Sequence, residues 1–136
     1  MTDIQAAIAA AASGMRAQTV RMRIAAENIA NANSTGTSPN EDPFRRRIPL
    51  LESTTLASGA RGVEVTGAIN DMSNFREEYN PSHPAADERG YVHLPNVDTL
   101  VEMMDLREAT RAYEANLNMI EAARTMTSRA LDLLRR

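Results

Sequence analysis

A seven-residue repeat of apolar and small side chains runs through the beginning of this 136-residue chain. Such a repeat, sustained over four heptads, is typical of helices that pack along their length. We therefore predict one long helix over residues 2–33, ending where Asn33 and Gly36 tolerate the left-handed conformation of helix C-caps. One heptad position holds Met1, Ile8, Met15, Met22 and Ile29, and its companion holds Ile4, Ala11, Gln18, Ala25 and Ala32.

A second long helix is predicted over residues 97–136. Asn96, Asp98 and Thr99 could each cap its N-terminus, and Thr99 with Glu102 fits a capping box. Tyr113 combines an apolar ring with a hydroxyl, as is common at interfaces, so we expect Tyr113→Ala to impair assembly more than monomer solubility. Met103, Leu117 and Leu131 share one heptad position, and Leu106, Tyr113, Ile120 and Leu134 share the next.

The region between the two helices differs in composition, since it holds all six prolines and five of the six glycines. Residues 44–53 and 62–69 read as strands of a β-hairpin, and 75–79 and 90–94 are shorter strand candidates. We therefore divide the chain into an N-terminal helix (1–35), a β-hairpin and loop region (36–95) and a C-terminal helix (96–136). The predicted fold is mainly α: two long terminal helices forming a coiled-coil-like pair, with the small β region between them.

Helix length argues against a compact globule. At 1.5 Å per residue the two helices would be roughly 48 and 60 Å long, whereas a compact domain of this size has a radius of gyration near ~14 Å. Aromatic residues make up only 4% of the chain, and the abundant alanines allow helix axes to approach closely. We expect an elongated subunit whose apolar stripes meet other subunits, because exposed stripes promote association.

Composition removes several classes of function. The formal net charge of -3 leaves no basic face for nucleic acid, and the lack of Cys excludes disulfides and thiolate metal sites. No segment reaches the roughly 20 apolar residues of a membrane span. Residues 6–14 resemble a secretory signal, but Asp3 and no Arg precede them, so no cleavable signal peptide is expected.

No catalytic, cofactor or metal site is predicted. His83 and His93 lack the spacing of a metal motif, and no serine lies in a nucleophile elbow. The run Arg45–Arg47 fits an interface better than nucleic-acid binding. In a strand, Arg45 and Arg47 would point one way and Arg46 the other, so the first two could pair with acidic patches of adjacent subunits.

The two terminal segments resemble those of the axial flagellar proteins, the rod and hook family. At the N-terminus the likeness lies in ASGMRAQ (12–18) and AENIANANSTG (26–36), and at the C-terminus in residues 96–133, with Tyr113, Ala115, Asn116 and Leu131 at recurrent positions. In the middle, DPFRRR (42–47) and residues 79–98 are similar to the proximal-rod, rod protein C branch of that family. NSTG departs mildly from the usual ending of its block.

The resemblance implies a structural subunit of the basal body that stacks helically into the periplasm-spanning rod and transmits torque. It implies export by the flagellar type III apparatus, and as partners the other rod subunits and ring or adaptor proteins. The asparagines of AENIANANSTG either cap the helix or also bond a neighbouring subunit. The alternatives are a coiled-coil adaptor or secretion regulator, which circular dichroism would show fully helical when free, and a small enzyme, which lacks a site.

The expected assembly interface takes its members from both heptad seams, the helix-ending asparagines and the arginine run. They are Ile4, Ile8, Ala11, Met15, Met22, Ala25, Asn28, Ile29, Asn31, Asn33, Arg45, Arg47, Met103, Leu106, Tyr113, Asn116, Leu117, Ile120, Leu131 and Leu134.

Overall fold

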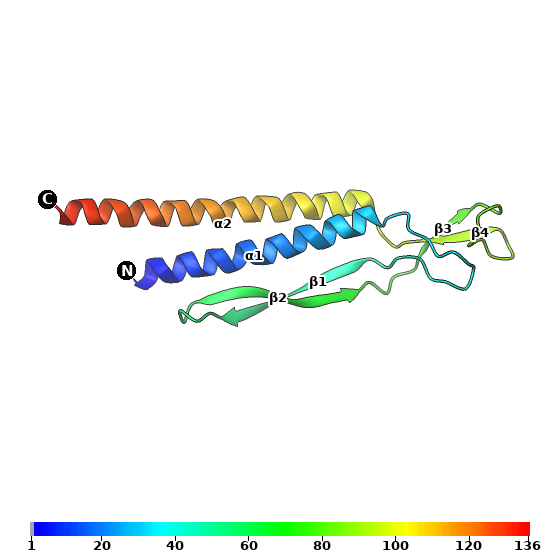
Figure 1. Cartoon of the computed structure of the whole chain (residues 1–136), viewed down its shortest axis with the longest axis horizontal. Coiled ribbons are helices and arrows are strands. Elements are labelled where there is room, and N and C mark those ends of the chain that lie inside the picture. Colours follow the sequence, from blue (N-terminus) through cyan, green and yellow to red (C-terminus); the bar gives the residue numbers. More distant parts are fainter. Residues whose placement is uncertain (1) are drawn as a thin grey trace.

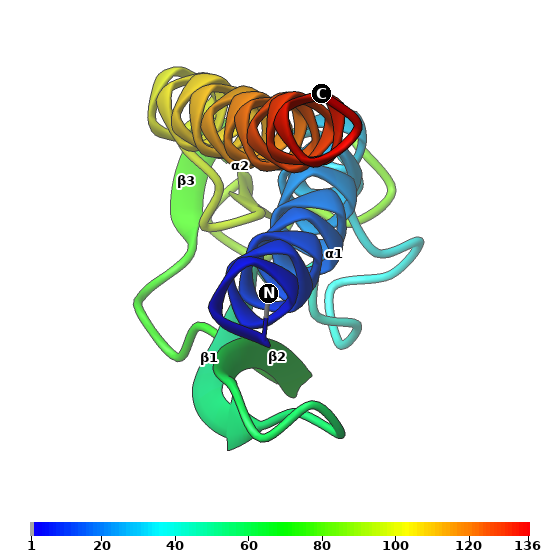
Figure 2. The same ribbon diagram turned by 90° about the vertical axis from the view of Figure 1, so that its left-hand side faces the viewer.

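The computed structural model describes residues 2–136 as an elongated molecule built in layers (Figure 1). Helix α1 lies between helix α2 on one side and the β1–β2 hairpin on the other, and β3 and β4 lie at the end of the molecule away from the termini (Figures 1 and 2). The mainly α fold with a small β region is confirmed. In chain order the elements are α1 (Thr2–Ala30), β1 (Arg47–Thr55), β2 (Arg61–Asn70), β3 (Arg76–Tyr79), β4 (Tyr91–Leu94) and α2 (Thr99–Leu134).

The two helices run side by side in opposite directions, and their axes separate toward the chain ends (Figures 1 and 2). At Gly14 the two helices are in tight contact, since an added Cβ would lie 2.7 Å from the side-chain amide nitrogen of Asn116. Further along, the hydroxyl of Thr110 lies 3.4 Å from the sulfur of Met22. Close packing of the two helices therefore depends on small residues in α1.

The face of α2 that packs on α1 differs by one residue from part of the predicted seam. Met103 and Leu117 lie one residue beyond the inner-face residues Glu102 and Asn116, and they are 50% and 38% exposed. Leu131 is 50% exposed and lines a groove together with Ile4 and Ile8 of α1. The predicted stripe therefore divides between an inner and an outer face. On the inner face Glu102, Ala109 and Ala123 are buried and Leu106, Tyr113, Asn116 and Ile120 are half-buried.

Helix α1 also contacts the hairpin on its other side. The Ser13 hydroxyl accepts a hydrogen bond from the backbone N–H of Val63 in β2, at 3.2 Å. An added Cβ on Gly62 would come within 2.6 Å of that hydroxyl. Ser13 thus faces β2 while its neighbour Gly14 faces α2, which explains why α1 is built from small side chains: it is packed on two sides.

The C-terminal end of α1 differs from the prediction. Within residues 2–136 the positive φ angles belong only to two glycines in β-turn regions, so left-handed conformations at Asn33 and Gly36 were wrongly predicted. The Asn31 side-chain amide donates to the Glu27 carbonyl, at 2.9 Å, and that carbonyl also accepts the backbone N–H of Asn31, at 3.1 Å. Asn31 thus bonds its own helix, and the proposed capping role of the asparagines stays a prediction.

Helix α2 begins at a single cap. The Asp98 carboxylate accepts from the N–H of Leu100, at 3.0 Å, so Asp98 is the N-cap. The predicted capping box of Thr99 and Glu102 does not form, because the Glu102 side chain points toward α1 and is buried there.

The predicted strands are confirmed. β1 and β2 pair antiparallel from Arg47↔Asn70 to Thr55↔Arg61, with a bulge after Leu50. Gly59, at φ +81°, makes the turn between them. The short candidates form a second antiparallel pair, β3 with β4.

Candidate functional site

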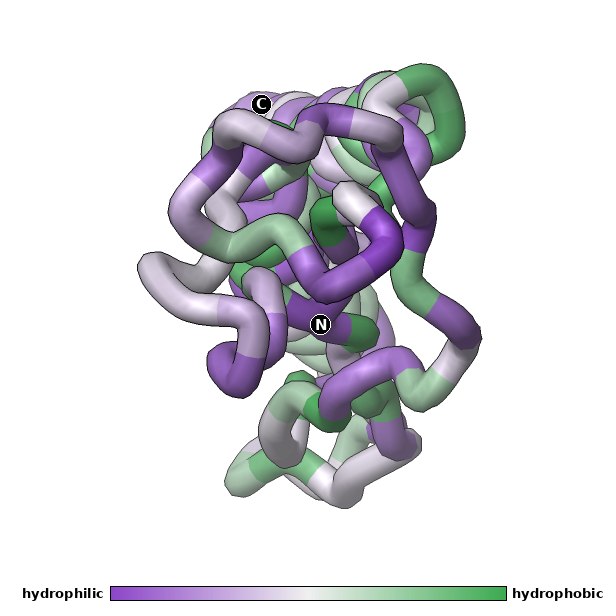
Figure 3. The backbone as a smooth tube through the Cα atoms, turned by 90° about the vertical axis from the view of Figure 1, so that its right-hand side faces the viewer, coloured by the Kyte–Doolittle hydropathy of each residue, from purple (hydrophilic) through white to green (hydrophobic). Residues whose placement is uncertain are grey.

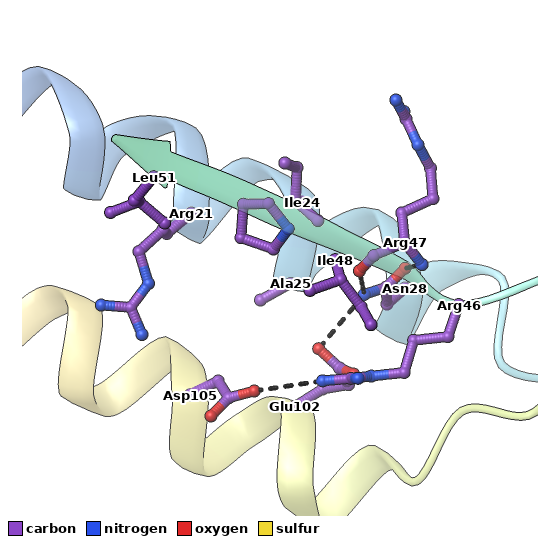
Figure 4. A pocket seen from close by; sticks show the side chains of 11 residues that line it. Arg21, Ile24, Ala25, Asn28, Arg46, Arg47, Ile48, Leu51, Glu102 and Asp105 are labelled. Atoms are coloured by element: carbon purple, nitrogen blue, oxygen red, sulfur yellow. Dashed lines mark hydrogen bonds and ion pairs between the residues drawn. The ribbon is translucent and has the colours of Figure 1, made fainter. Parts of the chain in front are cut away.

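Buried and half-buried polar side chains gather where the C-terminal part of α1, the segment entering β1 and the first turns of α2 meet (Figure 4). This cluster, the polar junction, draws on four separate parts of the chain. Its members are Asn28, Arg46, Asp71, Asn96, Glu102 and Asp105.

Asn28 attaches β1 to α1. Its side-chain amide donates to the carbonyl of Arg47, at 2.9 Å, while its side-chain oxygen accepts from the N–H of the same residue, at 3.0 Å. The amide therefore bonds the first residue of β1 as a neighbouring strand would. With 1% of its surface exposed, Asn28 has no access to water, so these bonds satisfy groups that would otherwise be costly to bury.

Glu102 lies at the centre of the junction and is 2% exposed. Its carboxylate accepts from the Asn28 amide, at 3.3 Å, and from Nε of Arg46. Arg46 also pairs with Asp71 and with Asp105, each at 3.4 Å. Burial disfavours the charge on Arg46, but its bonds to Glu102 and the other carboxylates outweigh that effect and raise its pKa.

Asn96 and Asp71 close the junction on the side of the loop after β2. The Asn96 side chain accepts from the N–H of Arg46, at 2.8 Å, and donates to the carbonyl of Asp71, at 2.9 Å. The N–H of Ser73 donates to the Asp71 carboxylate, at 2.9 Å. This bond and the Ser73 hydroxyl, with a smaller contribution from Arg46, lower the pKa of Asp71.

The junction is architectural. A cavity of about 270 Å³ lies beside it, lined by Arg21, Ile48, Leu51 and junction residues. Every buried side-chain nitrogen and oxygen of residues 2–136 has a hydrogen-bond partner, so the buried polar groups of the junction bond one another. Over the same residues no group of His, Asp and Glu side chains could hold a metal ion.

The structure shows part of the predicted alternation of the three arginines, although Arg45 and Arg46 precede β1. Arg46 points into the junction, whereas Arg47 points away from it and pairs with Glu27, at 3.3 Å (Figure 4). The Arg45 guanidinium lies 4.1 Å from the centre of the Phe75 ring and donates to the carbonyl of Asp71, at 2.9 Å, so it contacts the same residue as Arg46. Sequence reasoning singled out Arg45 and Arg47 and missed the contacts of Arg46 and Glu102.

The two histidines lie in the region of β3, β4 and the adjoining loops. His83 accepts at Nδ1 from the N–H of Ala85, at 3.0 Å, and its Nε2 lies 3.4 Å from the Thr35 hydroxyl. His93 lies 3.8 Å from Glu77 in the neighbouring strand. These contacts give both rings local structural roles.

The predicted interface residues fall into three groups by exposure. Ala11, Ala25 and Asn28 are buried inside the chain, and Asn33, Arg47, Met103, Leu117, Leu131 and Leu134 are exposed. Only the exposed group is fully available to a partner. The remaining members are half-buried: Ile4, Ile8, Met15, Met22, Ile29, Asn31, Arg45, Leu106, Tyr113, Asn116 and Ile120.

No helix in the described part of the chain combines the length and apolarity that a membrane span requires. The model of the flagellar basal body rod FlgEFG protein C-terminal region matches residues 88–133, which comprise β4, α2 and the turn before them.

Full-length relatives extend the match. The chain is 44% identical over 136 residues to the flagellar basal-body rod protein FlgC of Agrobacterium fabrum, covering 99% of this chain and 98% of the relative. It is 38% identical over 133 residues to FlgC of Aquifex aeolicus, covering 97% and 98%. For FlgC of Bacillus subtilis the identity is 36% over 138 residues, covering 90% and 92%.

These relatives are rod proteins of the flagellar basal body, so the predicted family, the predicted location in the basal-body rod and the predicted structural, non-enzymatic role are confirmed. The chain belongs to the FlgC family of flagellar basal-body rod proteins.

Proposed function

We propose that this chain is a subunit of the proximal rod that polymerises helically, crosses the periplasm and transmits torque. Its partners in this proposal are the other rod subunits, the ring or adaptor proteins around them, and the flagellar type III apparatus that exports it. Export and torque transmission rest on family membership. The assembly surface has support in the structure of the chain itself.

The observation that carries the proposal is the outer face of α2. Ten large apolar side chains of this helix are exposed: Leu100, Val101, Met103, Met104, Leu117, Met119, Met126, Leu131, Leu133 and Leu134. A monomer rarely leaves so much apolar surface in water, and at about 25 cal/mol per Å² its burial would favour association strongly. An elongated helix with an apolar outer face suits lateral packing into a tube.

We further propose that α1 and α2 form the coiled-coil-like inner layer of that tube. The inner-face positions of α2 from Glu102 to Thr127 alternate in steps of four and three residues, the spacing of a heptad seam. Small α1 residues such as Gly14 allow the two axes to approach, which supports tight packing around a narrow channel.

Motility of a strain that lacks the chain tests the proposal. Complementation with a Met103→Glu, Leu117→Glu double variant should leave cells without complete rods, because both side chains are exposed and would meet neighbours. Circular dichroism of the purified variant should be unchanged. Tyr113→Ala is a weaker test, because Tyr113 is half-buried against α1 and its loss would also affect the monomer.

Asn118→Glu with Thr110→Glu, which adds the same two charges at exposed polar positions of α2, is the matched control and should restore swimming. Normal swimming with the double variant, or with no chain at all, would contradict the proposal.

A further inference from the structure

The two outer layers of the molecule carry exposed charges of opposite sign that form no ion pairs among residues 2–136. On the hairpin, Glu52 and Glu64 are paired directly across β1 and β2, and both are exposed. Like charges directly opposite each other destabilise a strand pair. On α2, Arg107 and Arg111 are exposed and four residues apart, a spacing at which like charges also repel.

Neither pair forms an ion pair within the described residues, although Arg16 of α1 lines the same groove as Glu64. Within residues 2–136 no ion pair joins either glutamate to a basic group or either arginine to a carboxylate. Contact between the glutamate pair and the arginine pair would therefore relieve the repulsion within each pair.

Each pair lies beside exposed apolar side chains. Leu50 is two residues before Glu52 in β1 and so shares its face, as does Ile69 through its pairing with Ile48. Leu50 and Ile69 are 39% and 49% exposed. We call Leu50, Glu52, Glu64 and Ile69 the acidic hairpin patch.

The arginines line a surface groove of about 520 Å³ on α2 together with Val101, Met104, Asp105 and Glu108. Asp105 pairs with Arg46, and Glu108 makes no ion pair with either arginine within residues 2–136, so both guanidinium groups keep their donors for a partner. We call Val101, Met104, Arg107 and Arg111 the basic helix patch.

The two patches belong to opposite layers. α1 separates the hairpin from α2, and no β-strand of residues 2–136 packs against α2 (Figure 2). Figure 3, which looks along the molecule from the end opposite the termini, shows apolar stretches both at the top, where α2 runs, and at the bottom, where the hairpin lies. The patches therefore cannot meet within one chain, nor can both face a single partner copy.

We propose that the acidic hairpin patch of one copy docks on the basic helix patch of a second copy. Because the patches are different surfaces on opposite sides of the molecule, the contact is heterologous and repeats without closing. The inference rests on the proposed function, since it specifies a contact between like subunits of the rod. Charge complementarity sets the register of this contact, and the apolar side chains supply buried area.

Charge swapping tests the contact with the purified full-length chain in sedimentation velocity at low salt. Glu52→Arg with Glu64→Arg should weaken self-association at least about tenfold, as should Arg107→Glu with Arg111→Glu. Mixing the two double variants should restore association, because each presents the charges that the other needs. The quadruple variant should associate with itself.

Reversal of exposed charges outside the patches, Glu78→Arg with Arg129→Glu, is the control and should leave association unchanged. Failure of the mixture and of the quadruple variant to recover association would overturn the proposal.

Cysteine cross-linking gives a readout of geometry, since the natural chain contains no Cys. A chain carrying both Leu50→Cys and Met104→Cys should form an oxidised ladder of dimers, trimers and larger species. Each single variant should stay monomeric, and mixing the two should give dimers only. Dimers of one single variant alone would show a two-fold contact and overturn the proposal, as would the absence of any ladder.

Swimming distinguishes the two proposals. If the chain is a rod subunit but this contact is wrong, the deletion strain is non-motile while both charge-reversed variants restore swimming. If the proposed function itself is wrong, the deletion strain swims.

Discussion

Helices α1 and α2 have similar lengths and similar heptad patterns, yet they occupy different environments. α1 is packed on both sides, and none of its large apolar side chains among the described residues is among the exposed ones. α2 is packed on one side only, and ten of its large apolar side chains are exposed. Small residues therefore mark the helix that packs on two sides within the chain, and exposed large ones mark the helix that packs on one side.

This comparison predicts that inner positions control the stability of the subunit and outer positions control assembly. The largest effect is expected at Glu102, the one buried charge of α2. Glu102→Ala leaves Arg46 and Asn28 without their shared partner, which should lower the free energy of unfolding by about 3 kcal/mol. Urea unfolding followed by circular dichroism measures the change.

The control for Glu102 is Glu108→Ala, an exposed acid on the outer side of the same helix, which should change stability by less than about 0.5 kcal/mol. Equal effects of the two substitutions would remove the distinction between the inner and outer faces of α2.

Asn28→Ala should lower the free energy of unfolding by about 2 kcal/mol, because the N–H and carbonyl of Arg47 lose their buried partner. Hydrogen exchange should show a faster Arg47 amide, since the start of β1 is no longer held against α1. Asn33→Ala, at an exposed asparagine beyond the helix end, should change neither quantity. Unchanged exchange at Arg47 in the Asn28 variant would contradict the role given to the amide.

Gly14 tests how closely the two helices need to approach. Gly14→Leu forces a large side chain against Asn116 and should cost about 1.5 kcal/mol. Gly14→Ala should be nearly neutral, because the gain of about 1 kcal/mol in helix propensity offsets contact with a movable side chain. Combining Gly14→Ala with Asn116→Ala should be more stable than Asn116→Ala alone. A Gly14→Leu variant as stable as the natural chain would show that the helices can separate freely.

The smallest effect concerns the pH dependence of stability. The pKa of Asp71 is lowered by its bond from the Ser73 N–H, so its contribution is present above the unfolded-state pKa of about 4 and is lost as pH falls through the folded-state value. Asp71→Asn should therefore reduce the loss of stability between about pH 4 and pH 2. Asp42→Asn, at an exposed carboxylate, is the comparison. Identical acid-unfolding curves for the two variants would contradict the effect.

Much of the fold could be predicted from local signals. The heptad repeats predicted both helices. The alternation of apolar and polar residues between clusters of glycine and proline predicted both strand pairs. The errors concern positions where distant segments compete for one side chain. Glu102 fits a capping box locally, but its carboxylate bonds Arg46 and Asn28 instead. Met103 and Leu117 fit a heptad seam, but the face that α1 covers is set one residue earlier.

The candidate site was less predictable than the fold for the same reason. Strand alternation correctly set Arg46 apart from Arg47, but it could not reveal that a partner of Arg46 lies more than fifty residues away, on α2. The asparagines were noticed, yet only the structure distinguishes Asn28, which bonds β1, from Asn31, which bonds its own helix.

By itself, the sequence determined two long helices, a hairpin between them and the family to which the chain belongs, because periodicity and motif are local properties of a chain. The tertiary structure alone decided which helix lies in the middle, which face of α2 stays exposed and which polar groups meet in the junction. Those outcomes depend on contacts among three layers whose residues lie far apart in the sequence. No single segment contains the information that determines those contacts.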